Sequence, residues 1–220
     1  MRSAHDNPAR RSLLWLNVLG GIAVLGSYVH GLASNPLTRG ALWGDVPEAL
    51  RPFYTVNMFL AAAGYFAFSF FVFRRLDPAR TRIAGGFGFG AFHVLYALIL
   101  VPSALWLPLT FEMLEAPSAT LWLAIRVTLV LVGLGSLGLM AAVASAAPHG
   151  APGARRIALL GTLFFSLQTA VLDALVWPAY FPVQGGEGVP DMRIASRVAR
   201  RAITRACRTC SMRNHPFVDG

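Results

Sequence analysis

Two charged side chains lie inside long apolar stretches of the sequence, where charge is costly. Asp173 falls within SLQTAVLDALVWPAYFP (residues 166–182), and Arg126 falls within LWLAIRVTLV (residues 121–130). An isolated charge at the centre of a membrane-spanning helix costs roughly 2.5 kcal/mol or more. An ion pair lowers that cost for both partners, so the sequence predicts that these two residues pair. Such a pair either locks two helices together or also faces a cavity and contacts a ligand or a proton.

Amide, imidazole and indole groups accompany this predicted ion pair and point to a ligand pocket. We expect the pocket to lie near one end of the apolar stretches and to bind a small amphipathic or lipophilic molecule. The other side chains expected to line it are His30, Asn57, Trp106, Trp122, Gln168 and Trp177. Tryptophan is also enriched where helices meet the membrane interface, so the indoles alone have the simpler interpretation of an aromatic belt.

The sequence offers little for metal, haem or covalent catalysis. Its two cysteines, Cys207 and Cys210, stand without a second pair, so a four-cysteine zinc site is not available. His30 and His93 fall in spans that run the same way, at depths that differ by roughly 15 Å, so one haem iron cannot take both. We expect His93 to hydrogen-bond with Tyr96 instead. No catalytic or metal-binding set is predicted, and no cofactor is assigned.

Five apolar stretches of about 20 residues must position these side chains. The chain of 220 residues is 55% hydrophobic and 13% charged, whereas a typical soluble domain is about 25% charged. A helix of about 20 apolar residues crosses a hydrocarbon core of about 30 Å. We therefore predict an all-α, polytopic integral membrane protein, with a compact bundle of five transmembrane helices over residues 13–182. The predicted spans are 13–32, 54–73, 83–107, 119–144 and 157–180.

The distribution of arginine predicts the orientation, since all 19 basic residues are arginine. The N-terminal segment 1–12, the second-to-third connection and the fourth-to-fifth connection face one side and carry nine of them. The positive-inside rule places that side in the cytoplasm. Arginine without lysine, with abundant Ala, Gly and Pro, indicates a GC-rich genome, and we expect a bacterial inner membrane. The net charge of +9 lies outside the spans and does not indicate nucleic acid.

This topology places Arg126 and Asp173 at the same depth. Each lies about seven residues from the outer end of its span, which is about 10 Å at 1.5 Å per residue. Consecutive spans joined by a short connection are usually antiparallel neighbours. We therefore expect the two side chains to face each other.

The last segment, residues 183–220, is predicted to be a basic tail. From Asp191 onward, apolar residues fall on one face of a helical wheel and most arginines on the other. That pattern is typical of helices that lie on an anionic membrane surface. Five spans place this tail opposite the N-terminus, away from the leaflet that is usually anionic. A disordered tail, a re-entrant segment and a tail not native to the fold therefore stand as alternatives.

Glycines gather in GGFGFGAFH (residues 85–93), at the start of the predicted third span. Gly86 and Gly90 stand four residues apart, a spacing that lets membrane helices approach closely. We expect both to pack against a neighbouring helix, and this face could also support a homo-oligomer. Pro102 and Pro108 are expected to kink or end the third span.

Two short motifs resemble a known family. WLPLTF (residues 106–111) and LWLAI (residues 121–125) look like patterns of the tryptophan-rich sensory/translocator proteins. The resemblance covers less than a fifth of the chain and lacks the family's pattern in the fifth helix, so it assigns no site residue. It implies five helices and a ligand such as a tetrapyrrole or a sterol. Two other functions stay open: a transporter or permease subunit, and a structural subunit or assembly factor without a ligand.

Overall fold

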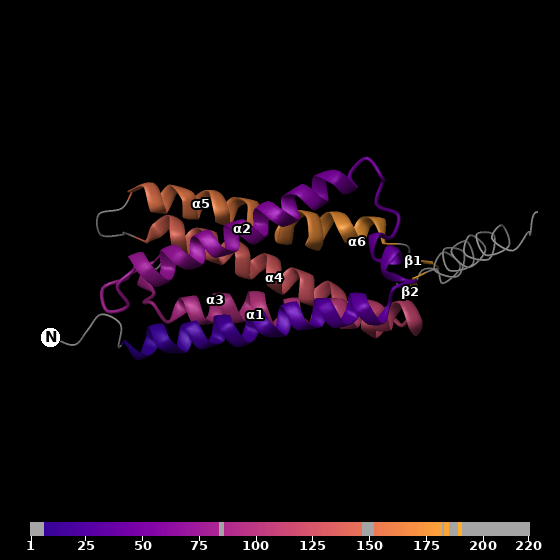
Figure 1. Cartoon of the computed structure of the whole chain (residues 1–220), viewed down its shortest axis with the longest axis horizontal. Coiled ribbons are helices and arrows are strands. Elements are labelled where there is room, and N and C mark those ends of the chain that lie inside the picture. The colour runs from indigo at the N-terminus through magenta and orange to yellow at the C-terminus, as the bar shows by residue number, and fades with distance from the viewer. Residues whose placement is uncertain (1–6, 84–85, 147–151, 182, 185–188, 191–220) are drawn as a thin grey trace, which may run out of the picture.

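Long helices make up most of the described chain (Figure 1). The computed structural model describes residues 7–83, 86–146, 152–181, 183–184 and 189–190. The helices are α1 Pro8–Ser34, the short 3-10 helix η1 Arg39–Trp43, α2 Arg51–Arg75, α3 Ala91–Glu115, α4 Ala119–Ser145, α5 Pro152–Ser166, the π-helix η3 Leu167–Val176 and α6 Trp177–Tyr180. Two short strands, β1 Val183–Gln184 and β2 Val189–Pro190, pair antiparallel after the last helix.

Five helices are long and apolar enough to cross a membrane; the fifth runs without a break from α5 through η3 to α6. Many large apolar side chains point away from the bundle, among them Phe59, Phe66 and Leu25. Such a surface suits lipid, where helices also satisfy their own backbone hydrogen bonds. The prediction of an all-α bundle with five apolar helices is confirmed, and its insertion into a membrane follows from helix length and composition.

Local sequence signals set the helix ends. The side chain of Asn7 accepts a hydrogen bond from the Ala9 amide and caps α1, with Pro8 at the first helical position. Ser118 caps α4 in the same way through the Leu121 amide. The observed first, second, fourth and fifth spans contain the predicted ones and extend them by a few residues.

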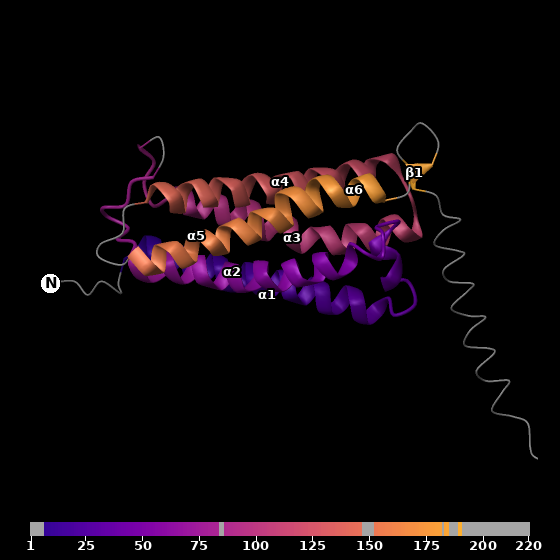
Figure 2. The ribbon, with the colours of Figure 1, turned by 90° about the horizontal axis from the view of Figure 1, so that it is seen from above.

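The helices pack in an order that differs from their order in the chain. α3 packs on both α1 and α4, while α2 packs mainly on α5. Figure 2 shows α5 starting beside α2 and its continuation through α6 ending close to α4, and η3 correspondingly packs more on α4 than on α2. The starts of α1, α3 and α5 and the ends of α2 and α4 lie together at what we call the arginine-rich end (Figure 1). The other end, where Trp43, Trp106, Trp122 and Trp177 gather, we call the tryptophan-rich end.

α2 and α5 touch through their backbones at two glycines. A Cβ atom on Gly64 would lie 2.8 Å from the Gly161 Cα, closer than any real contact, and a Cβ atom on Gly161 would lie 2.9 Å from the Gly64 Cα. Small residues allow such close approach in membrane bundles. The two helices are antiparallel, so residues two turns from these glycines, seven positions earlier on α2 and seven positions later on the fifth span, meet again on the same seam.

The predicted start of the third span is wrong. α3 begins at Ala91, eight residues later than expected, and runs on to Glu115. Gly86 has a φ of +83°, which favours glycine and does not continue a right-handed helix. Gly86 and Gly90 therefore precede the helix, and a Cβ atom on either would meet nothing within 4 Å. Their predicted role in helix packing is contradicted.

Pro102 and Pro108 both lie inside α3, so of the kink or helix end predicted for them the kink stays a prediction. The hydrogen bond predicted for His93 needs correction. His93 does not pair with Tyr96: its Nε2 lies 2.8 Å from the Ser12 hydroxyl of α1, and Tyr96 instead hydrogen-bonds with Ser69 of α2 at 2.9 Å. With the later start of α3, His93 lies in the first turn of the helix, beside α1. The basic tail predicted from Asp191 lies outside the described residues.

Candidate functional site

The π-helix η3 places Gln168 and Asp173 on one face of the fifth span. In an α-helix, two residues five apart are rotated by about 140°, at about 100° per residue, and cannot touch. A π-helix joins residues i and i+5, so these two positions stack. Gln168 Nε2 accordingly donates to Asp173 Oδ1 at 2.8 Å. The π-helix ends just before Pro178, whose ring would clash with the carbonyl four residues earlier in a regular helix, and a wider turn relieves that clash.

A chain of polar groups links the fifth span to α2. Asn57 Nδ2 donates to Gln168 Oε1 at 3.0 Å and to the Phe164 carbonyl at 3.3 Å. Asn57 is only 3% exposed, so these bonds satisfy an amide that is sealed inside the bundle. With the bond from Gln168 to Asp173, the chain runs from α2 to the carboxyl group. Asn57 lies seven residues before Gly64 and Gln168 seven residues after Gly161, so this link lies two turns away on the same antiparallel seam as the two glycines.

Two tyrosines belong to the candidate site. The Tyr54 hydroxyl donates to the Leu172 carbonyl at 2.9 Å and so satisfies a carbonyl of the π-helix. Tyr28 on α1 contacts the Trp106 ring, with ring centroids 6.0 Å apart. Neither tyrosine was among the predicted site residues. Both stand near the ends of apolar stretches, where tyrosine is ordinary, so the sequence carries no signal that separates them from an aromatic belt.

The predicted ion pair between Arg126 and Asp173 is not formed. Arg126 is exposed on α4, and its guanidinium lies over the Trp122 ring, 5.8 Å from the ring centroid. Ile125 and Leu129 lie on the buried face of α4, whereas Arg126 points out of the bundle. A long arginine side chain in that position reaches toward the interface rather than inward. Among the described residues, Arg80 and Asp77 form the one ion pair, at the arginine-rich end.

The predicted tryptophans do come together. The Trp177 ring packs on Trp106, with centroids 5.8 Å apart, on Trp122 at 6.1 Å and on Phe181 at 4.6 Å, and Trp106 also contacts Tyr28 at 6.0 Å. These rings fill the space between α3, α4 and the fifth span. The indole N–H of Trp106 is buried, and among the described residues it has no hydrogen-bond partner. A buried donor without a partner is unusual and marks a place where a ligand atom or water could bind.

The α1–α2 connection covers this cluster. Trp177 donates its indole N–H to the Leu42 carbonyl at 2.8 Å, and the Asp45 amide donates to the Tyr180 carbonyl at 2.9 Å. Gly44 has a φ of +54°, which turns the chain so that it passes directly over α6. The covering segment, residues 39–46, therefore closes the tryptophan-rich end.

His30 does not join the site. It is exposed near the end of α1, and its ring lies 3.5 Å from the Ser34 hydroxyl of the same helix. Of the predicted residues, the structure thus brings together Asn57, Gln168 and Asp173 in one hydrogen-bonded chain, and Trp106, Trp122 and Trp177 in one aromatic cluster. Both groups lie toward the tryptophan-rich end.

The arrangement can recognise a polar or charged group. A carboxyl group among apolar helices, bonded to one neutral amide, can accept a further hydrogen bond or balance a positive charge on a ligand. In the part of the chain that the structure describes, no group of three or more His, Cys, Asp or Glu residues is arranged to hold a metal ion.

Comparisons with protein-family models, with curated proteins and with solved structures find no match to this chain. The resemblance to the tryptophan-rich sensory/translocator proteins therefore rests on the two short motifs alone. The function must be argued from the site itself.

Proposed function

We propose that this protein binds a small amphipathic or lipophilic ligand at the tryptophan-rich end, with Asp173 as its polar anchor. The observation that carries the proposal is the Asp173 carboxyl group, held by Gln168 and without an ion-pair partner among the described residues. A carboxyl group in an apolar bundle is costly and marks a functional site by default. The ligand would present a hydrogen-bond donor or a positive charge to Asp173 and an apolar face to the indole rings.

Three features around Asp173 support this proposal. The π-helix is a structure that proteins use sparingly and often at functional sites. The buried Trp106 indole N–H offers a second polar contact. The covering segment 39–46 is held to the fifth span by two hydrogen bonds and by the buried Val46, so its movement would admit a ligand without unfolding any of the five long helices.

The proposed setting is the inner membrane of a bacterium, with the N-terminus in the cytoplasm. The arginine-rich end supports it, since arginines near span ends mark the cytoplasmic side. A reporter fused to residue 1 that reports a periplasmic location would overturn this orientation.

A structural subunit without a ligand is the second candidate, because the aromatic rings already fill the space between the helices at the tryptophan-rich end. In that case the hydrogen-bonded chain from Asn57 to Asp173 only fixes the helices. The two candidates differ in one measurable respect, since only the first requires that a ligand stabilise the protein.

Thermal unfolding of the purified full-length protein distinguishes them. We would titrate haem, protoporphyrin, sterols and quinones and follow unfolding by circular dichroism. A ligand should raise the unfolding temperature of the wild type, and Asp173→Asn should weaken its binding by at least about tenfold, the loss of a charged hydrogen bond. The substituted amide keeps the shape of the carboxyl group, and its oxygen can still accept from Gln168. The control Arg126→Gln removes an exposed charge and should bind normally.

Two results would count against the proposal. If no compound in the panel shifts the unfolding temperature, the structural role is favoured. If a compound binds Asp173→Asn as tightly as the wild type, Asp173 is not the anchor.

A further inference from the structure

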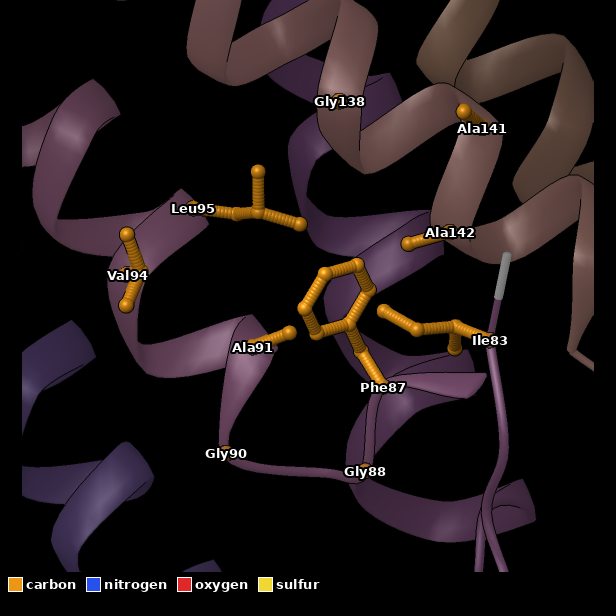
Figure 3. Close-up of a pocket in the computed structure, with 10 residues that line it drawn as sticks. All are labelled: Ile83, Phe87, Gly88, Gly90, Ala91, Val94, Leu95, Gly138, Ala141 and Ala142. Carbon is orange, nitrogen blue, oxygen red and sulfur yellow. The ribbon is translucent and has the colours of Figure 1, made fainter. Parts of the chain in front are cut away.

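A groove of about 520 Å³ lies at the arginine-rich end, far from the candidate site (Figure 3). It runs between the first turn of α3 and the last turns of α4. Its floor and walls carry small or apolar residues, among them Ala91 and Leu95 from α3, Gly138 and Ala142 from α4, and Phe87 from the α2–α3 connection. The volume falls within the range of about 300–1,000 Å³ that is usual for small-molecule sites.

The groove opens to the outside of the bundle. Phe87 is 64% exposed and Val94 is 61% exposed, so two of the apolar side chains at its rim face the surroundings of the helices. Figure 3 shows the Phe87 ring between Ile83, Ala91 and Ala142, with no polar side chain drawn among the lining residues. In a membrane, this opening meets the first methylene groups of the acyl chains, because it lies at helix ends rather than at mid-depth.

A positive charge stands beside the groove. Arg82 is exposed, and its Nη1 lies 3.4 Å from the position that a Cβ atom on Gly88 would take, which places the guanidinium against a lining residue. Among the described residues, the Arg82 side chain makes no ion pair, and the nearby Asp77 pairs with Arg80 at 3.9 Å. Arg74 and Arg75 end α2 nearby in the chain and are also exposed.

From the apolar groove and the adjacent arginine we infer that this place binds an anionic phospholipid. One acyl chain lies along the groove between α3 and α4, and the lipid phosphate contacts Arg82. Basic groups next to gaps between membrane helices are a recurring way to hold anionic headgroups. Charge favours this occupant over a second copy of the protein, because a symmetric interface at this groove would place an additional Arg82 on the shared face without adding an acidic partner.

Lipid titration of the full-length protein, followed by native mass spectrometry, tests the inference. The probes are phosphatidylglycerol, phosphatidylcholine with the same chains, and sn-glycerol 3-phosphate as a headgroup without chains. We expect phosphatidylglycerol to bind preferentially and the free headgroup phosphate not to be retained. Arg82→Gln should reduce the preference for phosphatidylglycerol by about fivefold, the effect of one interfacial arginine. Ala141→Trp, which fills the groove from an exposed position, should weaken both phospholipids.

Matched variants elsewhere in the chain complete the test. Arg39→Gln removes an exposed arginine at the other end, and Leu134→Trp adds an indole to the lipid-facing side of α4 away from the groove. Both should bind lipid like the wild type. Equal binding of the two phospholipids, or an Arg82→Gln variant with unchanged preference, would overturn the inference. A dimer mass that Ala141→Trp abolishes would also overturn it, since the face would then be an interface between two copies.

Discussion

Replacing Gly64 by alanine should force α2 and α5 apart and break the hydrogen bond that links α2 to the site. The new Cβ atom would stand 2.8 Å from the Gly161 Cα, whereas carbon atoms prefer a separation of about 3.5 Å or more. The helices must therefore separate by about 0.7 Å at this point. Because both are rigid and antiparallel, the movement carries to Asn57 and Gln168, two turns away on the same seam.

That displacement is large for the Asn57–Gln168 bond. Its donor–acceptor distance of 3.0 Å would stretch to about 3.7 Å, which is no longer a hydrogen bond. Overpacking typically costs about 1–3 kcal/mol, and a hydrogen bond between membrane helices contributes about 0.6 kcal/mol. We therefore expect Gly64→Ala to lower the free energy of unfolding by about 2–3 kcal/mol. Reversible unfolding in mixed detergent–SDS micelles, followed by circular dichroism, measures this quantity.

The matched control is Gly26→Ala on α1, since a Cβ atom there meets nothing within 4 Å. It should leave stability unchanged or slightly raised, because alanine favours a helix. A double-mutant cycle between Gly64→Ala and Asn57→Ala isolates the coupling, which should be about 0.5 kcal/mol or more. If Gly64→Ala is as stable as Gly26→Ala, or if the two changes add without coupling, the close seam and its link to the site are refuted.

Three further predictions concern the tryptophan-rich end. Exchanging the charges, Arg126→Asp with Asp173→Arg, should rescue neither stability nor ligand binding relative to the single changes, because the two residues do not pair; unfolding free energies check this. Trp177→Phe removes the bond to the Leu42 carbonyl and should increase amide hydrogen exchange in residues 39–46 by about five- to tenfold, as for the loss of about 1 kcal/mol; unchanged exchange would argue against its role in holding that segment. Pro178→Ala removes the clash that favours the π-helix and should weaken any ligand that depends on Asp173, as read from thermal shifts; equal binding would show that the π-helix does not need the proline.

Hydropathy predicts the five spans because burial in lipid needs only length and apolar composition. Four of the five predicted spans lie inside the observed helices. The predicted start of the third span was wrong because a run of glycine and apolar residues was read as part of the helix. Glycine such as Gly86 has no side chain to pack and no preference for helical backbone angles. A continuous apolar run therefore does not fix where the helix begins.

The sequence predicted several residues of the candidate site but not the contacts between them. The positions of Asn57, Gln168 and Asp173 along the predicted spans placed them toward one end of the bundle. Position along a span does not show which face of the helix a residue occupies. Arg126 shows this limit, since it is exposed on α4 and does not face Asp173. The bond between Gln168 and Asp173 could not be predicted from the sequence, because it requires a π-helix. The prediction used the rotation of a regular α-helix, which separates these two residues.

The pairing of α2 with the fifth span has a consequence for biogenesis. α2 leaves the ribosome long before α5, yet Asn57 finds its partners Phe164 and Gln168 only on that last span. Before the last span is inserted, the side-chain amide of Asn57 is exposed to lipid or to transient partners, and this exposure costs free energy. A truncated chain that ends before residue 152 never gains these partners for Asn57. The amide that links α2 to Asp173 in the folded protein would thus be an exposed polar group in the incomplete protein. Membrane chaperones and proteases could recognise the incomplete protein by this group.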